Sequence, residues 1–144
     1  MELDDLDVKI VALLKEDGRA TNHELAEQLS VSEGTIRNRI KKLADGGFLA
    51  IRGMTNPELI HDRRVVFLGM KVAMSKDLAV AAEAVSRLPN VCAVSVVTGR
   101  YDIIAEIFIE PYKIIEFLGK DLAGLSSIVS TESFVTLKNW NKWI

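Results

Sequence analysis

Hydrophobic residues in the first 50 positions recur every three or four residues, as they do along amphipathic helices. The first stripe runs from Leu6 to Leu14 and predicts a helix that Asp4 caps and Gly18 ends. Shorter stripes lie on either side of Ser30, and their members are Leu25, Leu29, Val31, Ile36, Ile40 and Leu43. Because these stripes can close on one another across a tight turn, Asn22 to Leu43 predicts a helix-turn-helix.

The last of these three helices should begin near Glu33, because Ser32 can accept hydrogen bonds from the amides of its first turn. With Ile36 on the buried side, a rotation of about 100° per residue leaves one polar, basic face exposed. The residues of that face are Gly34, Thr35, Arg37, Asn38, Lys41 and Lys42. Such a face is typical of a helix that enters the major groove of DNA. Arg39 lies beside the buried stripe, and its guanidinium either grips a phosphate or pairs with an acid of the preceding helix.

The chain changes character after Leu43. Gly46 and Gly47 predict a turn, and the hydrophobic residues at 48, 49 and 51 predict a short strand of the kind that forms the wing of a winged helix-turn-helix. The segment from Arg52 to Arg64 mixes Gly, Asn, Pro and charge in the manner of a connector. We therefore expect a helix-turn-helix domain at 1–50, a connecting strand or hinge at 51–64, and a second domain at 65–144.

The second domain alternates strand and helix patterns. We predict strands at 65–73, 91–98, 103–109 and 128–137, and helices at 78–88 and 112–122. The order βαββαβ predicts a ferredoxin-like antiparallel sheet with both helices on one face, so the expected fold class is α+β. The strands carry hydrophobic residues on both faces, which predicts that a second copy of the chain covers the other face. We expect at least a dimer.

Composition narrows the possible partners and location. The hydrophobic fraction of 49% excludes disorder, and a net charge of −2 hides the local basic face formed by Arg37, Arg39, Lys41 and Lys42. The single cysteine, Cys92, lies in an apolar run and predicts a core residue in a reducing compartment. No charged-then-apolar leader opens the sequence, and no apolar run approaches the ~18 residues that span a bilayer. These features predict a cytoplasmic protein without a membrane partner.

A polar segment, TGRYD at Thr98 to Asp102, separates the two middle strands. Gly99 can adopt positive φ, so one interpretation is a hairpin turn in which Asp102 bonds local amides. In a second interpretation, the backbone amides near Gly99 and Arg100 join the Asp102 carboxylate to bind a small zwitterion. Spacing alone leaves both open.

An ordered set of motifs resembles the Lrp/AsnC family of transcription regulators. The set comprises the opening Leu3 to Leu43, TNP at Thr55 to Pro57, TGRYD, and STESFVTLK at Ser130 to Lys138. The resemblance implies a DNA-binding helix-turn-helix and a ferredoxin-like domain that drives oligomerisation and senses amino acids. The sequence departs from the pattern of many relatives after the third helix, where it lacks a tyrosine and a later glycine.

Further expectations follow from this resemblance alone. It assigns DNA contact to Ser32, Thr35, Arg37, Asn38, Arg39 and Lys41. It places an effector site between subunits near Gly99, Tyr101, Asp102, Thr131 and Ser133, beside Arg100. The implied partners are double-stranded DNA, further copies of the chain as a homodimer that assembles to a tetramer or octamer, and a small amino acid. We expect Trp140 and Trp143 to pack at a subunit contact or against the same chain.

Two other classes of function remain as alternatives. Siroheme decarboxylases resemble this family, and chemistry on an anionic tetrapyrrole would require histidines and arginines in the second domain. The only histidines, His23 and His61, lie outside it by the predicted boundaries. The sequence has no paired carboxylates, metal-ligand spacing or nucleophile elbow, so we predict no enzyme, cofactor or metal site. A pure assembly or sensing module with a degenerate DNA face is the second alternative, and the intact cation cluster argues against it.

Overall fold

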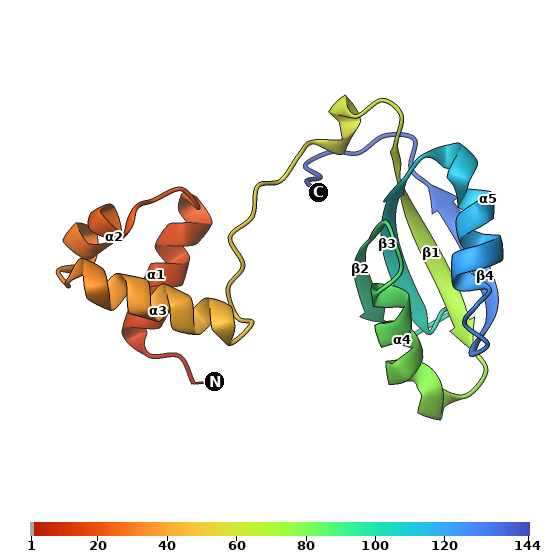
Figure 1. Cartoon of the computed structure of the whole chain (residues 1–144), viewed down its shortest axis with the longest axis horizontal. Coiled ribbons are helices and arrows are strands. Elements are labelled where there is room, and N and C mark those ends of the chain that lie inside the picture. Colours follow the sequence, from red (N-terminus) through yellow and green to blue (C-terminus); the bar gives the residue numbers. More distant parts are fainter. Residues whose placement is uncertain (1) are drawn as a thin grey trace. The chain divides into compact units, whose positions relative to one another are not determined.

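The computed structural model describes residues 2–144, which form two compact units with bounds Met1–Gly53 and Met54–Ile144 (Figure 1). The first unit contains three helices, α1 (Asp5–Glu16), α2 (Asn22–Leu29) and α3 (Glu33–Asp45). Its core gathers the predicted stripes, and the fully or almost fully buried members are Ile10, Leu14, Leu25, Ala26 and Ile36. The predicted three-helix arrangement is therefore confirmed.

Side chains fix where these helices begin. Asp4 and Thr21 each form a capping box with the third residue of the following helix, Asp7 and Glu24. Ser32 caps α3, and its Oγ accepts a hydrogen bond from the Thr35 amide at 3.1 Å. Each cap satisfies an amide that the helix leaves without a partner, so the sequence sets the helix starts locally.

The turn between α2 and α3 is tight because Ser30 adopts a left-handed conformation, with φ of 55°. The Val31 amide donates back to the carbonyl of Ala26 at 3.1 Å, which closes the end of α2. α3 can then start two residues later, at Glu33, after its cap. This turn holds α3 across α2, as a helix-turn-helix requires.

The predicted wing strand is wrong. No strand forms between α3 and Arg64, the first residue of β1. The amides of Phe48 and Leu49 instead donate to the carbonyl of Leu43 at 3.0 and 3.1 Å, and Gly47, with φ of 71°, closes the end of α3. A lone strand has no partner for its backbone groups, so the helix end captures them. Leu49 packs on the helical core, whereas Phe48 is 51% exposed.

The second unit has the predicted βαββαβ order. Its strands are β1 (Arg64–Val72), β2 (Val91–Val96), β3 (Ile103–Ile109) and β4 (Ile128–Val135), hydrogen-bonded in the antiparallel order β2-β3-β1-β4. Helix α4 (Leu78–Ser86) follows β1. The second helical run has three parts, η3 (Pro111–Lys113), α5 (Ile114–Glu116) and η4 (Phe117–Leu122). Pro111 lies in its first turn, as predicted.

Both helical runs pack on one face of the sheet. The side chains of Val66, Leu68 and Met70 on β1 are fully buried there, together with Val85 of α4 and Phe117 of η4. The opposite face, which we call the open face, is not bare as the sequence suggested. The Tyr101 ring covers Gly69 at its centre, and Lys142 reaches Glu106 at 2.6 Å. Hydrophobic side chains such as Phe134, 46% exposed, remain accessible.

The prediction that Cys92 belongs to the core is wrong, because its side chain is exposed. Cys92 lies on the edge strand β2 at a register shift between Val91 and Ala93. Only Val91 and Val94 of this strand pack toward the helices. Hydrophobic periodicity could not distinguish a strand covered on one face from one buried on both.

The last residues of the chain are held against the residues that precede β1. Thr55 and Ile144 exchange backbone hydrogen bonds of 2.6 and 3.0 Å, and Glu58 accepts two from Asn139 at 2.9 and 2.8 Å. Residues 54–64 are thus part of the second compact unit. Trp140 and Trp143 are 78% and 54% exposed, so packing against the same chain covers little of Trp140.

Candidate nucleic-acid interface and effector cavity

The outer face of α3 carries most of the predicted DNA-contacting residues. Arg37, Asn38, Lys41 and Lys42 are exposed, and Gly34 and Thr35 are half-buried. Within residues 2–144, the side chains of Arg37, Asn38 and Lys42 form no hydrogen bond or ion pair with another side chain. A side chain at Gly34 would lie 3.8 Å from Nη2 of Arg37 and from Oγ of Ser32. Because Gly34 has no side chain, the surface of α3 stays close to the helix backbone at the start of this face.

Arg39 does not belong to this face. Its guanidinium donates to Asp4 and, at 3.2 Å, to Asp7, whose carboxylate is only 1% exposed. The expected ion pair forms, but the prediction that its acid comes from the preceding helix is wrong, because both acids belong to α1 and its cap. The hydrogen bond to Asp4 raises the pKa of Arg39, and the Asp7 amide together with Arg39 lowers the pKa of Asp4. Arg39 therefore fixes α3 against α1.

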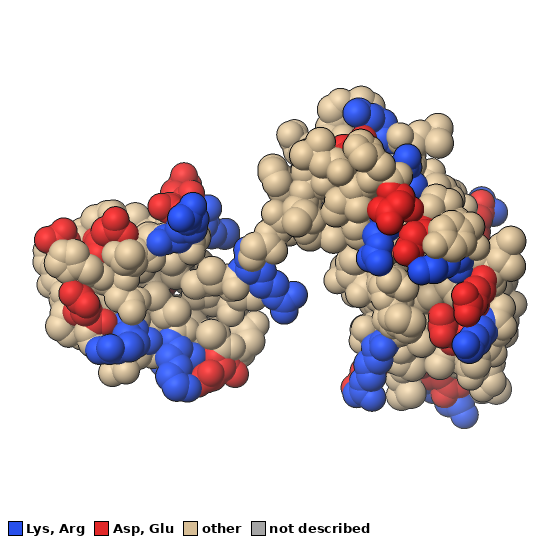
Figure 2. Space-filling view, turned by 45° about the horizontal axis from the view of Figure 1, so that its top comes forward, with Lys and Arg blue, Asp and Glu red and all other residues tan. Residues whose placement is uncertain are grey.

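Electrostatics around α3 are mixed rather than uniformly basic. Lys41 pairs with Asp45 one turn later, and both side chains are more than half exposed, so the pair is weak and can open. Thr35 shares a 2.9 Å hydrogen bond with Ser32. In Figure 2, basic and acidic side chains lie next to one another on the visible face of both units. On α3, the cations that form no ion pair among the described residues are Arg37 and Lys42.

The TGRYD segment forms a turn between β2 and β3 in which Gly99 has φ of 118°. The Asp102 carboxylate accepts a hydrogen bond from the amide of Val72 at 2.9 Å, and its Oδ1 lies 3.7 Å from Nζ of Lys71. The amide of Asp102 donates to the carbonyl of Met70 at 2.9 Å. Asp102 thus has a structural role in tying the turn to β1, but its carboxylate bonds an amide of another strand rather than the local amides expected for a hairpin turn.

Tyr101 turns onto the open face of the sheet. A methyl group at Gly69 would lie 2.7 Å from the Tyr101 ring, so the ring rests directly on the glycine backbone. The Tyr101 hydroxyl donates to Glu132 of β4, and the ring meets Phe134 edge-on with centroids 6.2 Å apart. Arg100 lies over the same ring at 5.5 Å and pairs with Glu132 at 3.3 Å. Arg100, Tyr101 and Glu132 together form one wall of a cavity.

That cavity has a volume of about 350 Å³ and lies on the open face near one edge of the sheet. Its lining residues are Lys71, Arg100, Tyr101, Ser130, Thr131 and Glu132. Of the predicted effector residues, it brings together Arg100, Tyr101 and Thr131. Gly99 and Asp102 are in the same turn but not in the lining. Ser133 pairs with Leu68, whose side chain faces the helices, so Ser133 points to the helix-covered face and away from the cavity.

Sequence reasoning missed Lys71, Ser130 and Glu132. Their signal is the two-residue period of a strand, because Ser130 and Glu132 alternate with Thr131 and Ser133. Choosing the correct alternation requires the pairing of β4 with β1, in which Gly69 lies opposite Glu132. The cavity combines cations, an anion and hydroxyl groups, a set that complements a small molecule with both charges.

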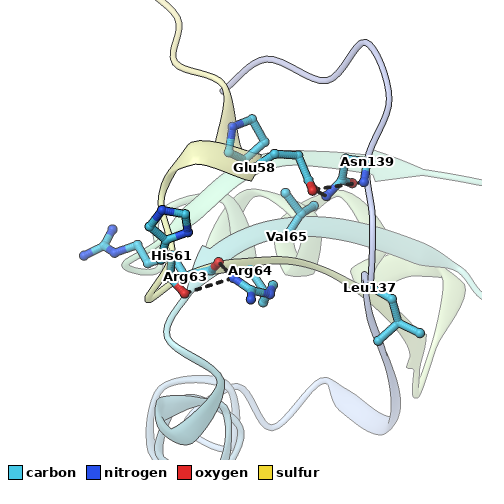
Figure 3. Close-up of a pocket in the computed structure, with 8 residues that line it drawn as sticks. Glu58, His61, Arg63, Arg64, Val65, Leu137 and Asn139 are labelled. Atoms are coloured by element: carbon cyan, nitrogen blue, oxygen red, sulfur yellow. Dashed lines mark hydrogen bonds between the residues drawn. The ribbon is translucent and has the colours of Figure 1, made fainter.

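A second, much smaller cavity lies between the connector and the last residues, and Figure 3 shows its lining. His61, Arg63 and Arg64 meet there, opposite Glu58 and Asn139. The guanidinium of Arg64 is occupied by the carbonyls of His61 and Arg63 at 3.1 and 2.7 Å. The volume is about 60 Å³, which suits water molecules and is far too small for a tetrapyrrole. His23, on α2, bonds Glu33 at 2.9 Å.

Among residues 2–144, no group of three or more His, Cys, Asp or Glu side chains could hold a metal ion. Within the same range, the structure has no helix with the length and apolar character needed to cross a membrane.

Comparison with known proteins agrees with this geometry. Residues 3–44 match the AsnC-type helix-turn-helix domain, and residues 65–142 match the Lrp/AsnC ligand binding domain. An uncharacterised HTH-type transcriptional regulator of Pyrococcus furiosus is 36% identical over 141 residues, which are 96% of this chain and 93% of that protein. The structure of AsnC from E. coli has a TM-score of 0.70 and 27% identity, covering 96% of this chain and 95% of that one.

A further solved structure carries a small molecule. A transcriptional regulator of Neisseria meningitidis in complex with L-methionine has a TM-score of 0.74 and 26% identity, covering 98% of this chain and 94% of that one. A helix-turn-helix joined to a ferredoxin-like ligand-binding domain defines a DNA-binding transcriptional regulator. The chain belongs to the Lrp/AsnC family.

Proposed function

We propose that this regulator binds operator DNA through the outer face of α3 as a homodimer, which assembles to a tetramer or octamer. The contacting residues are Ser32, Gly34, Thr35, Arg37, Asn38, Lys41 and Lys42. The observation that carries this assignment is the exposure of Arg37, Asn38 and Lys42 without protein partners in the described chain. Arg39 is absent from this set, because it neutralises Asp7 inside the unit.

The expected operator follows from the symmetry of a dimer. Two α3 helices related by a two-fold axis would contact half-sites about one helical turn apart, ~10 base pairs, or a multiple of that. Asn38 would pair with a base edge, and the neighbouring cations would hold the phosphates. Binding should therefore weaken steeply as salt rises.

The first experiment is selection of bound genomic fragments at ~150 mM salt, followed by footprinting of the full-length protein. We expect protection in two dyad-related blocks. Asn38→Ala should weaken specific binding by about 5- to 150-fold, which is ~1 to 3 kcal/mol. Lys9→Ala, an exposed cation on α1, is the matched control and should bind like the parent. Unchanged footprints in the Asn38 variant would contradict the proposed face.

We also propose that the cavity beside Tyr101 binds a small amino acid. Lys71 and Arg100 can hold a carboxylate, whereas Glu132 can hold an ammonium group, and a volume of about 350 Å³ admits such a molecule. The regulator of Neisseria meningitidis with bound L-methionine supports this class of ligand. Binding at a cavity near the edge of the sheet would favour one assembly over another and change the spacing of the DNA-binding units.

Thermal shift against a panel of amino acids tests this second proposal. A ligand at 100 times its Kd should stabilise the parent by ~2.7 kcal/mol. Arg100→Gln should reduce that stabilisation, because Arg100 lines the cavity and can hold the carboxylate of the ligand. Arg87→Gln is the matched control, since Arg87 and Arg100 are 75% and 78% exposed. A parent that responds to no member of the panel would remove the support for an effector site.

A further inference from the structure

Helix α1 has a second stripe on the side that faces away from its own core. Ile10 and Leu14 fill the core, with exposures of 0% and 7%. At about 100° per residue, Val8 and Ala12 point in the opposite direction. Val8 is 54% exposed, and Ala12 is also exposed. An outward stripe of small hydrophobic residues is not needed to fold this unit.

The stripe forms the floor of a shallow groove of about 200 Å³. The lining residues are Leu3, Val8, Val11, Ala12, Lys15 and Phe48. Phe48 comes from the segment after α3, where the predicted strand is absent and the ring is 51% exposed. A contiguous hydrophobic groove in contact with water favours association with another surface.

The charges at the two ends of the stripe indicate which surface could associate with the groove. Asp5 lies at the start of α1 and Lys15 near its end, and both are exposed. Within residues 2–144, neither forms an ion pair. In an antiparallel pair of α1 helices with its two-fold axis near position 10, Asp5 lies opposite Lys15 of the second copy and Val8 lies opposite Ala12. The stripe is therefore complementary to itself in both shape and charge.

We propose that α1 pairs in antiparallel fashion with α1 of a second copy of this chain. Ala12 lets the two helices approach closely, and the two symmetry-related pairs of Asp5 with Lys15 fix the direction and register. One helix pair buries too little surface to hold a dimer by itself. The inference therefore rests on the proposed assembly of the chain, in which other surfaces also take part.

This pairing would determine how far apart the two α3 helices lie. Within each unit, Arg39 joins α3 to Asp4 and Asp7 at the start of α1, and Ile10 and Ile36 share one core. Each α3 helix is thus rigidly attached to its α1 helix. Pairing the α1 helices fixes the separation of the recognition faces and hence the spacing of the half-sites.

Disulfide cross-linking of the full chain tests the geometry. In a Cys92→Ser background, a Val8→Cys chain is mixed with an Ala12→Cys chain carrying a different tag, and the mixed product is measured without DNA. We expect it to form faster than the product of Ala12→Cys with Arg19→Cys, a control whose exposed site lies beyond the end of α1. Equal rates for the two mixtures would overturn the proposal.

Charge exchange tests the register. Asp5→Lys and Lys15→Asp should each lower the rate of cross-linking about tenfold, because two attractive contacts become repulsive. The double variant should recover most of the rate, although it keeps the unfavourable cation in the first turn of α1. A double variant no better than the single variants would refute the pairing. Light scattering separates the two proposals: oligomers that fail to cross-link refute the helix pairing alone, whereas a monomeric parent refutes the proposed assembly as well.

Discussion

Gly69 is the position where a single methyl group should disturb the second unit most specifically. A Cβ atom at Gly69 would lie 2.7 Å from two ring carbons of Tyr101, whereas ordinary contact begins near 3.4 Å. The ring must therefore move outward by roughly 0.7 Å or tilt away from the sheet. Because Gly69 lies in the middle of β1 between β3 and β4, the backbone cannot yield instead.

The magnitude follows from the contacts that Tyr101 would lose. Its hydroxyl donates to the Glu132 carboxylate, a kind of bond worth about 1.5 to 3 kcal/mol, and its ring packs edge-on against Phe134, worth about 0.5 to 1.5 kcal/mol. Replacing glycine inside a strand returns about 0.5 to 1 kcal/mol of conformational entropy. We expect Gly69→Ala to lower the free energy of unfolding by about 2 kcal/mol, or Tm by roughly 8 to 16 °C.

Tryptophan fluorescence is the suitable assay, because both tryptophans lie in the second unit. The variants are compared at one protein concentration so that assembly contributes equally. Gly119→Ala is the matched control, since a Cβ atom there meets nothing within 4 Å. In a double-mutant cycle, Gly69→Ala should cost little once Tyr101 is alanine. If the cost of Gly69→Ala is the same with and without the Tyr101 ring, the contact between them is not its cause.

Three further predictions concern the first unit and the edge strand. Ser32→Ala should destabilise α3 by ~1 kcal/mol through loss of its cap, seen as faster exchange of the Thr35 amide while α2 amides stay unchanged. The Asp7 amide and Arg39 hold the pKa of Asp4 below 3.8, so its stabilising effect is complete above that pH and is lost as the pH falls through the lowered pKa; Asp4→Asn should abolish this part of the acid transition in circular dichroism. Partial burial and Glu106 raise the pKa of Cys92, so iodoacetamide at pH 8 should react more slowly with the native chain than with the unfolded chain, and equal rates would contradict this.

Local rules predicted the elements of this fold well. The predicted caps Asp4 and Ser32 mark the starts of α1 and α3, and the strand β3 occupies the predicted residues 103–109. The failures arise where pairing with a distant segment decides the outcome. Phe48 and Leu49 form no strand because no second strand lies beside them, and Cys92 is exposed because its edge strand is covered on one side only.

The candidate effector site was predictable in position but not in composition. TGRYD indicated the correct turn, but the orientation of β4 depends on which of its residues lies opposite Gly69. A shift of one residue exchanges Glu132 for Ser133, and a single sequence does not specify that register. Tyr101 could not be placed either, because its position depends on the absence of a side chain at Gly69.

Some basic residues on α3 are paired with acids and others are not, and this difference leads to a final prediction about DNA binding. Four cations lie within two turns, but Arg39 already compensates a buried carboxylate, and moving it to a phosphate would leave Asp7 unpaired at 1% exposure. Arg39 should therefore release no counterions on binding, whereas Lys42 should release about one in each bound chain. For two bound units, Lys42→Gln should reduce the slope of log Kobs against log salt concentration by about 1.8, and Arg39→Gln should leave it unchanged. Titrations between ~50 and 200 mM salt, below the unfolding temperature of each variant, measure both slopes. A similar reduction in the Arg39 variant would mean that the ion pair with α1 opens when the protein binds DNA.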